Sequence, residues 1–118
     1  MIRSYRDLEV YQKAYGLALK VHRITLTFPR HEITELGSQL RRAALSIPVN
    51  IGEGYGRKDS VADFKRFLTI ALASCDEVRI ELDFAKDLGY IGEAEHAELT
   101  NEYDVLGKQL RTLQAKWK

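Results

Sequence analysis

The chain has 118 residues, of which 45% are hydrophobic and 30% charged, with two Pro and one Cys. This size and composition predict one globular domain, 1–118, and exclude a disulfide framework or a multi-thiolate zinc site. The net charge of +1 is low for a dedicated nucleic-acid binder. A single cysteine fits a reducing compartment, so we expect a cytoplasmic protein, and no window holds the ~20 apolar residues of a membrane span, so we expect no membrane contact.

The charge is distributed unevenly along the chain. Residues 1–60 hold 10 Lys and Arg against 6 Asp and Glu, a net +4, whereas residues 61–118 hold 8 against 11, a net −3. Because opposite charges attract, a basic first half and an acidic second half predict that copies of the chain associate with one another.

The first predicted helix begins at Ser4 or Asp7, either of which can cap it, and runs to Phe28, because Pro29 disfavours helix in the residue before it. Its main apolar stripe alternates steps of four and three residues: Val10, Ala14, Leu17, Val21, Ile24 and Phe28. A second stripe has the same spacing: Leu8, Tyr11, Tyr15 and Ala18. An apolar surface of this width predicts neighbours on two sides of the helix.

The second predicted helix covers about Glu32 to Gly52, with a kink at Pro48 because proline lacks the N–H that the helix needs. Three glycines within residues 52–56 predict that the helix ends there, and they lack the Gly-Lys-Ser/Thr ending of a phosphate-binding loop. We interpret Asn50 and Glu53 as caps of this helix end and not as catalytic groups. The predicted buried face is Ile33, Leu36, Leu40, Ala43 or Ala44, Ile47 and Ile51.

The third predicted helix runs from a cap at Asp59 or Ser60 to Leu88, where Gly89 stops it, and the fourth runs from about Glu93 to the chain end. The third stripe is Phe64, Leu68, Ala71, Cys75, Val78, Leu82, Ala85 and Leu88. The fourth stripe is Leu99, Tyr103, Leu106, Leu110, Leu113 and Trp117. Four amphipathic helices with short connections predict an all-α fold, an antiparallel up-down-up-down four-helix bundle.

The polar residues form no catalytic or metal-binding pattern. A helical di-metal site needs Glu-x-x-His on two helices, and the spacing from Glu93 to His96 has no second copy, so we expect His22, His31 and His96 to be surface residues. Cys75 lies on an apolar stripe and is expected to be a core residue and not a nucleophile. The sequence therefore predicts no enzyme, no cofactor, no metal ion and no small-molecule substrate.

Six basic residues flank the connection between the second and third predicted helices. Because these helices are antiparallel neighbours, we expect the six side chains to form one positive strip that can hold phosphates, with a merely solvated charged surface as the alternative. Tyr55 is the one aromatic residue evident beside the strip, which favours contact with a nucleic-acid backbone over reading of bases. The strip comprises Arg41, Arg42, Arg57, Lys58, Lys65 and Arg66.

The segment SIPVNIGEGYGR, residues 46–57, resembles the four-helix bundle proteins encoded in the intervening sequences of bacterial 23S rRNA genes. Gly52 stands where alanine is expected. The stretches 7–14, 35–43 and 64–82 resemble the family's first three helices, so the likeness spans residues 5–91 and the fourth helix is generic. The residues of the central motif are Pro48, Asn50, Glu53 and Gly54.

This resemblance implies a bundle that assembles into a homopentameric ring. It also implies a relation in fold to the accessory variability determinant of diversity-generating retroelements, to which binding of nucleic acid and of a reverse transcriptase is ascribed. The family has no established activity. We therefore expect a ring-forming protein that binds RNA or DNA, or a nucleic-acid-bound protein, through the basic strip. The alternative is a scaffolding oligomer that recruits a protein partner without touching nucleic acid.

Overall fold

The computed structural model describes residues 1–118 and contains helices but no strand. Two short helices, the 3-10 helix η1 (Tyr5–Asp7) and α2 (Arg30–Ile33), accompany four long ones. None of the helices has the length and hydropathy that a membrane span requires. The long helices are α1 (Glu9–Thr25), α3 (Leu36–Gly56), α4 (Val61–Asp87) and α5 (Glu93–Lys116).

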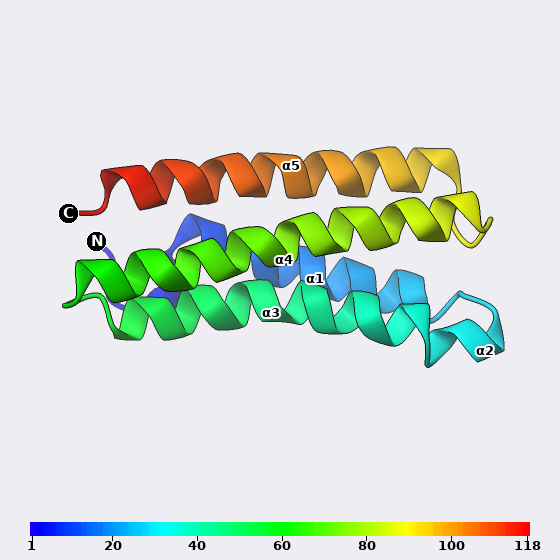
Figure 1. The fold of residues 1–118 in the computed structure, drawn as a ribbon, viewed down its shortest axis with the longest axis horizontal. Coiled ribbons are helices and arrows are strands. Elements are labelled where there is room, and N and C mark those ends of the chain that lie inside the picture. The colour runs from blue at the N-terminus through cyan, green and yellow to red at the C-terminus, as the bar shows by residue number, and fades with distance from the viewer.

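The four long helices form a rod of 45 × 22 × 22 Å around one core (Figure 1). Helix α3 packs against α1 and α4, and α5 packs against α4 and α1. Successive long helices run in opposite directions, so the predicted antiparallel four-helix bundle is confirmed. Both chain termini and the α3–α4 connection lie at one end of the rod, which we call the turn end. Helix α2 and the α4–α5 connection lie at the other, which we call the α2 end.

The predicted apolar stripes supply most of the core. Every residue of the third stripe is buried except Leu88, which follows α4 and is 53% exposed. Tyr15, from the second stripe of α1, is 52% exposed, so that stripe is only partly covered within one chain. The stripes thus identify the core correctly, and they leave apolar side chains on the surface.

The first predicted helix is interrupted at Leu8. A capping box closes η1: the Ser4 hydroxyl accepts a backbone N–H, and the Asp7 carboxylate accepts the Ser4 N–H at 3.3 Å. Leu8 then takes an extended backbone with φ −72° and ψ 127° and is buried. Helix α1 also ends at Thr25 and not at Phe28, whose buried ring packs on Tyr90 with centroids 5.5 Å apart.

The second predicted helix is two helices, and its predicted end is wrong. Glu35, with φ −103° and ψ −97°, separates α2 from α3, which continues through the glycines to Gly56, with Pro48 buried inside it. The reason is close packing between helices: a Cβ on Gly54 would lie 2.6 Å from the Cβ of Phe67 on α4. Gly54 therefore allows α3 to approach α4 and does not terminate the helix.

Asn50 and Glu53 consequently cap no helix end. The Asn50 amide donates to the backbone carbonyl of Ser46 at 2.8 Å and to its Oγ at 3.0 Å. The Ser46 and Ser74 hydroxyls are 2.9 Å apart, so this group connects α3 to α4. Glu53 is exposed beside a groove between α1 and α3. Asn50 is a structural residue of the α3–α4 contact.

Candidate nucleic-acid interface

The six predicted basic residues lie at two separate places on the rod. Arg41 and Arg42 lie near the start of α3, at the α2 end. With a rise of 1.5 Å per residue, they are roughly 20 Å along the helix from its last turn. The structure therefore brings four of the six together and leaves two apart. The four at the turn end are Arg57, Lys58, Lys65 and Arg66.

Arg41 is occupied by contacts within the fold. Its half-buried guanidinium donates to Thr25 Oγ1 at 2.8 Å and to the Ile33 carbonyl at 2.9 Å. These two bonds join the end of α1, the end of α2 and the first turns of α3. Arg42, the next residue, is exposed. We therefore assign Arg41 to the stability of the α2 end.

Aromatic rings hold three of the four basic side chains at the turn end. The guanidinium carbons of Arg57 and Arg66 lie 5.3 Å and 4.8 Å from the ring centre of the same residue, Phe67. The Lys58 ammonium lies 4.7 Å from the centre of the Tyr55 ring. A cation over an aromatic face is attracted by the ring quadrupole. The rings thus restrict where these charges can lie.

Carboxylates neutralise this surface only weakly. The four basic side chains make one ion pair, between Arg66 and Asp63 at 3.8 Å, and both of these side chains are exposed. Asp59 is also exposed, nearby in the turn. An exposed pair of this kind contributes about 0–1 kcal/mol. Lys116 and Lys118 add positive charge, since the C-terminus lies at the same end (Figure 1). The turn end therefore keeps an excess of positive charge.

An aromatic cluster lies beside the basic side chains, and sequence reasoning identified only Tyr55 there. Trp117, just after α5, packs edge to face on Phe64 of α4 with centroids 4.6 Å apart. Tyr55 lies 6.2 Å from Phe64 and 6.4 Å from Trp117. The fold brings these rings together from three helices. No local sequence signal could have shown that they share one surface with the arginines.

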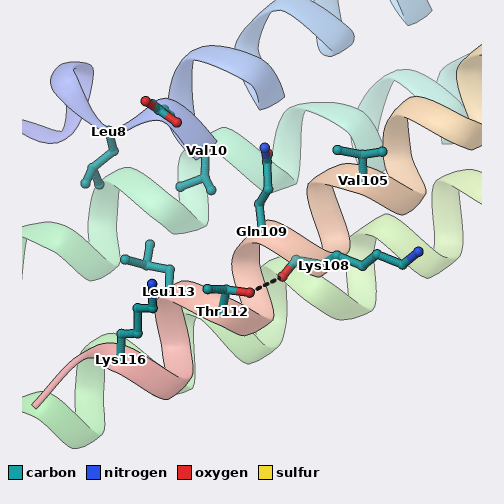
Figure 2. Close-up of a pocket in the computed structure, with 9 residues that line it drawn as sticks. Leu8, Val10, Val105, Lys108, Gln109, Thr112, Leu113 and Lys116 are labelled. Carbon is teal, nitrogen blue, oxygen red and sulfur yellow. Dashed lines mark hydrogen bonds between the residues drawn. The ribbon is translucent and has the colours of Figure 1, made fainter.

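A groove of about 440 Å³ lies between α1 and α5 (Figure 2). The Thr112 hydroxyl donates to the Lys108 carbonyl of its own helix at 3.0 Å. The lining contains one carboxylate and no Ser, Cys or His, so it pairs no nucleophile with a base. The residues lining it are Leu8, Glu9, Val10, Val105, Lys108, Gln109, Thr112, Leu113 and Lys116.

The remaining titratable groups form no metal centre. Cys75 is a core residue as predicted, and burial raises the pKa of its thiol to about 12, so it stays protonated. His22 and His31 are exposed. His96 is half-buried at the surface, with its Nε2 2.6 Å from Asp83 Oδ1. No group of three or more His, Cys, Asp or Glu could hold a metal ion.

One carboxyl group in the groove between α3 and α4 is perturbed. Burial, with repulsion from Glu77 as the smaller cause, raises the pKa of Glu81 to about 7. Its Oε1 is buried and has no hydrogen-bond partner. Ile80 and Phe84 stand exposed beside it, at 57% and 59%. The site is a carboxyl group on an apolar surface, without a nucleophile or a metal cluster.

Comparisons with known proteins agree with this architecture. A family model described as "23S rRNA-intervening sequence protein" matches residues 6–112, which extends the likeness from residue 91 through most of α5. A crystal structure from Bacteroides thetaiotaomicron, of a protein with unknown function from the S23 ribosomal protein family, has a TM-score of 0.79 and 24% sequence identity. The match covers 89% of this chain and 97% of that one, and it shows the fold. No curated protein matches the chain.

Proposed function

The chain belongs to the 23S rRNA-intervening sequence protein family, and from that premise we propose that it is a non-enzymatic RNA-binding protein that acts as a ring-shaped oligomer. The observation that carries RNA binding is the turn end, where four basic side chains share one weak ion pair and three of them are held on aromatic rings. The family name ties these proteins to ribosomal RNA genes, which favours RNA over DNA.

Phosphate contacts dictate how such binding depends on salt. Each contact by Lys or Arg releases condensed counterions, so the logarithm of the affinity falls linearly with the logarithm of the salt concentration. Four contacts predict a slope of roughly −3 to −4 for each bound protomer. The nearly neutral chain, at +1, makes this local group decisive because the overall charge contributes little attraction.

Charge reversal at the two ends of the rod tests the location. Lys58→Glu/Lys65→Glu and the matched control Arg23→Glu/Arg30→Glu change the net charge equally. We expect the first double variant to weaken binding of a structured RNA at least tenfold in fluorescence anisotropy. The control, at the α2 end, should stay within twofold of the wild-type affinity. Absent binding, salt-independent binding, or equal losses in both variants reject the proposal.

Two exposed apolar surfaces support self-association. The first lies between α1 and α3, beside the exposed Arg42 and His22. The second runs along α4, beside the acidic residues Asp76 and Glu77. The first surface comprises Tyr15, Leu19, Leu45 and Val49, and the second comprises Ile70, Ile80, Phe84 and Leu88.

These two surfaces differ in shape and in charge, so a contact between them joins unlike faces of two copies. A heterologous contact generates a closed ring when its rotation closes. Arg42 gives the first surface a basic rim toward the α2 end, and this rim and the acidic rim of the second surface favour this pairing over pairing of like surfaces. Complementary surfaces of this kind favour a ring without fixing its number of subunits, and the family resemblance implies five.

Light scattering tests the ring. We expect a mass of five times the 13.5 kDa chain at micromolar concentration. Phe84→Glu on the α4 surface and Leu45→Glu on the α1–α3 surface should each yield monomers with unchanged helical circular dichroism. A matched control, Leu26→Glu, changes an exposed leucine outside both surfaces and should keep the wild-type mass. A wild-type monomer contradicts the proposal.

If a protein partner instead of a second copy covers the exposed apolar surface of α4, the second function is that of a scaffold for that protein. A pull-down with such a scaffold should recover a specific protein. Nuclease treatment should not change this recovery, and Phe84→Glu should abolish it. Loss of the captured protein on nuclease treatment would instead favour RNA binding.

A further inference from the structure

Two arginines from different segments share one aromatic ring at the turn end. Arg57 follows α3, Arg66 lies in α4, and the Phe67 ring lies within 5.3 Å of both guanidinium carbons. Phe67 is only 8% exposed, so most of its ring is embedded in the protein. A ring fixed in this way limits the positions that the two guanidinium groups can take to those close to the ring.

The position of Phe67 is itself fixed by the backbone of α3. Gly54 allows the Phe67 Cβ to approach to 2.6 Å from where an alanine Cβ would stand, and Phe64 Cδ1 lies 3.1 Å from the same point. Two helices at this separation leave Phe67 little freedom to move. The contact between Gly54 and Phe67 therefore presets the arrangement of the two arginines.

The guanidinium groups retain unused hydrogen-bonding capacity. The Arg57 side chain makes no hydrogen bond or ion pair within the chain, and Arg66 makes only the 3.8 Å contact to Asp63. A guanidinium that lies near a ring without donating hydrogen bonds to other groups keeps N–H donors free to bind the oxygens of a phosphate. Side chains ordered before binding also lose less conformational entropy when they bind.

We propose that Phe67 is a positioning residue that presents Arg57 and Arg66 together to phosphate groups of an RNA strand. This inference rests on the proposed RNA binding and deepens it. A diffuse positive surface needs only the charges, and the ring would then be irrelevant to affinity. If Phe67 positions the two arginines, full RNA affinity requires the Phe67 ring as well as the charges. A variant that removes the ring and keeps the charges distinguishes the two cases.

The test removes the ring while keeping every charge. Phe67→Leu keeps an apolar side chain against Gly54, and circular dichroism checks that the protein folds. We expect RNA affinity in fluorescence anisotropy to fall roughly three- to tenfold. The salt slope should be unchanged because no charge is removed. Phe67→Tyr, which keeps an aromatic ring at this position, should bind RNA with the wild-type affinity.

A second pair of variants keeps the test decisive if Phe67→Leu fails to fold. Arg57→Lys/Arg66→Lys retains the charges but loses the planar guanidinium, and it should weaken binding to a similar extent. The matched control, Arg23→Lys/Arg30→Lys, alters two exposed arginines outside the turn end and should bind as the wild type does. In a protein that already carries Phe67→Leu, the Arg57→Lys/Arg66→Lys change should lower RNA affinity by a smaller factor than it does in the wild type, because the Phe67 ring acts through these arginines.

Two RNA forms identify the phosphate that is bound. Equal affinity for RNA with a 5′-phosphate and with a 5′-hydroxyl supports contact with backbone phosphates. A preference for the phosphorylated form that depends on Phe67 and that inorganic phosphate competes away supports contact with a terminal phosphate. Salt-dependent RNA binding that neither Phe67→Leu nor the double lysine variant weakens overturns this inference and leaves the proposed function standing. Absence of RNA binding in the wild type overturns both.

Discussion

Gly52 and Gly54 lie two residues apart in α3, and their alanine variants should change stability in opposite directions. An alanine Cβ at position 52 would meet the Tyr5 ring at 3.5 Å, an ordinary contact. At position 54 it would meet the Phe67 Cβ at 2.6 Å, which real structures do not tolerate without a shift. That Cβ is attached directly to the backbone of α4, so relief requires the two helices to move apart.

The magnitudes follow from two opposing effects. Replacing glycine by alanine inside a helix stabilises it by about 1 kcal/mol, and both variants gain this. Overpacking a close contact costs about 1–3 kcal/mol, and only Gly54→Ala incurs it. We therefore expect Gly52→Ala to stabilise the protein by about 1 kcal/mol and Gly54→Ala to destabilise it by up to about 2 kcal/mol.

Urea unfolding followed by circular dichroism at 222 nm measures both changes. All variants must be compared at one protein concentration, since association shifts apparent stability. Gly16→Ala is a third arm because nothing lies within 4 Å of its new Cβ, and it should behave as Gly52→Ala does. Equal stabilisation by all three substitutions would refute the close contact between α3 and α4 at Gly54.

Three further predictions concern groups that are buried or half-buried within the chain. Arg41→Lys loses two hydrogen bonds and should lower the free energy of unfolding by about 1–3 kcal/mol while leaving RNA affinity unchanged, whereas Arg42→Lys should change neither. Because the pKa of Glu81 is raised from 4.5 to about 7, the folded state holds a proton that the unfolded chain releases, so stability should fall as the pH rises through this window. Glu81→Gln should remove that fall and Glu98→Gln should keep it, in urea titrations from pH 4 to 8. The Cys75 thiol, with its pKa raised to about 12, should react with Ellman's reagent only at the rate of unfolding, and fast labelling of the native protein would contradict its burial.

The fold was predictable because the apolar residues of each long helix recur every three or four positions. Such spacing depends only on the helix itself, so it can be read from one sequence. The glycines at 52–56 could not be interpreted in the same way. A glycine marks either a turn or a close approach of two helices, and only the position of Phe67 decides between them.

The candidate site was predictable in part for a similar reason. Four basic residues close in sequence, 57–66, remain close in space because a short turn joins their helices. Arg41 belongs to the fold because its partners, Thr25 and Ile33, come from other elements that sequence does not place. Trp117 reaches the site from the far end of the chain. Contacts between distant segments are thus what the sequence alone could not show.

Photo-crosslinking of a 4-thiouridine-labelled structured RNA, with crosslinked peptides identified by mass spectrometry, tests most directly where the protein binds. We predict crosslinks within residues 55–67 and 112–118, which form the turn end, and their loss in Lys58→Glu/Lys65→Glu. Crosslinks confined to residues 30–42 at the α2 end, or none above the level of a protein of similar charge, would contradict the proposed interface.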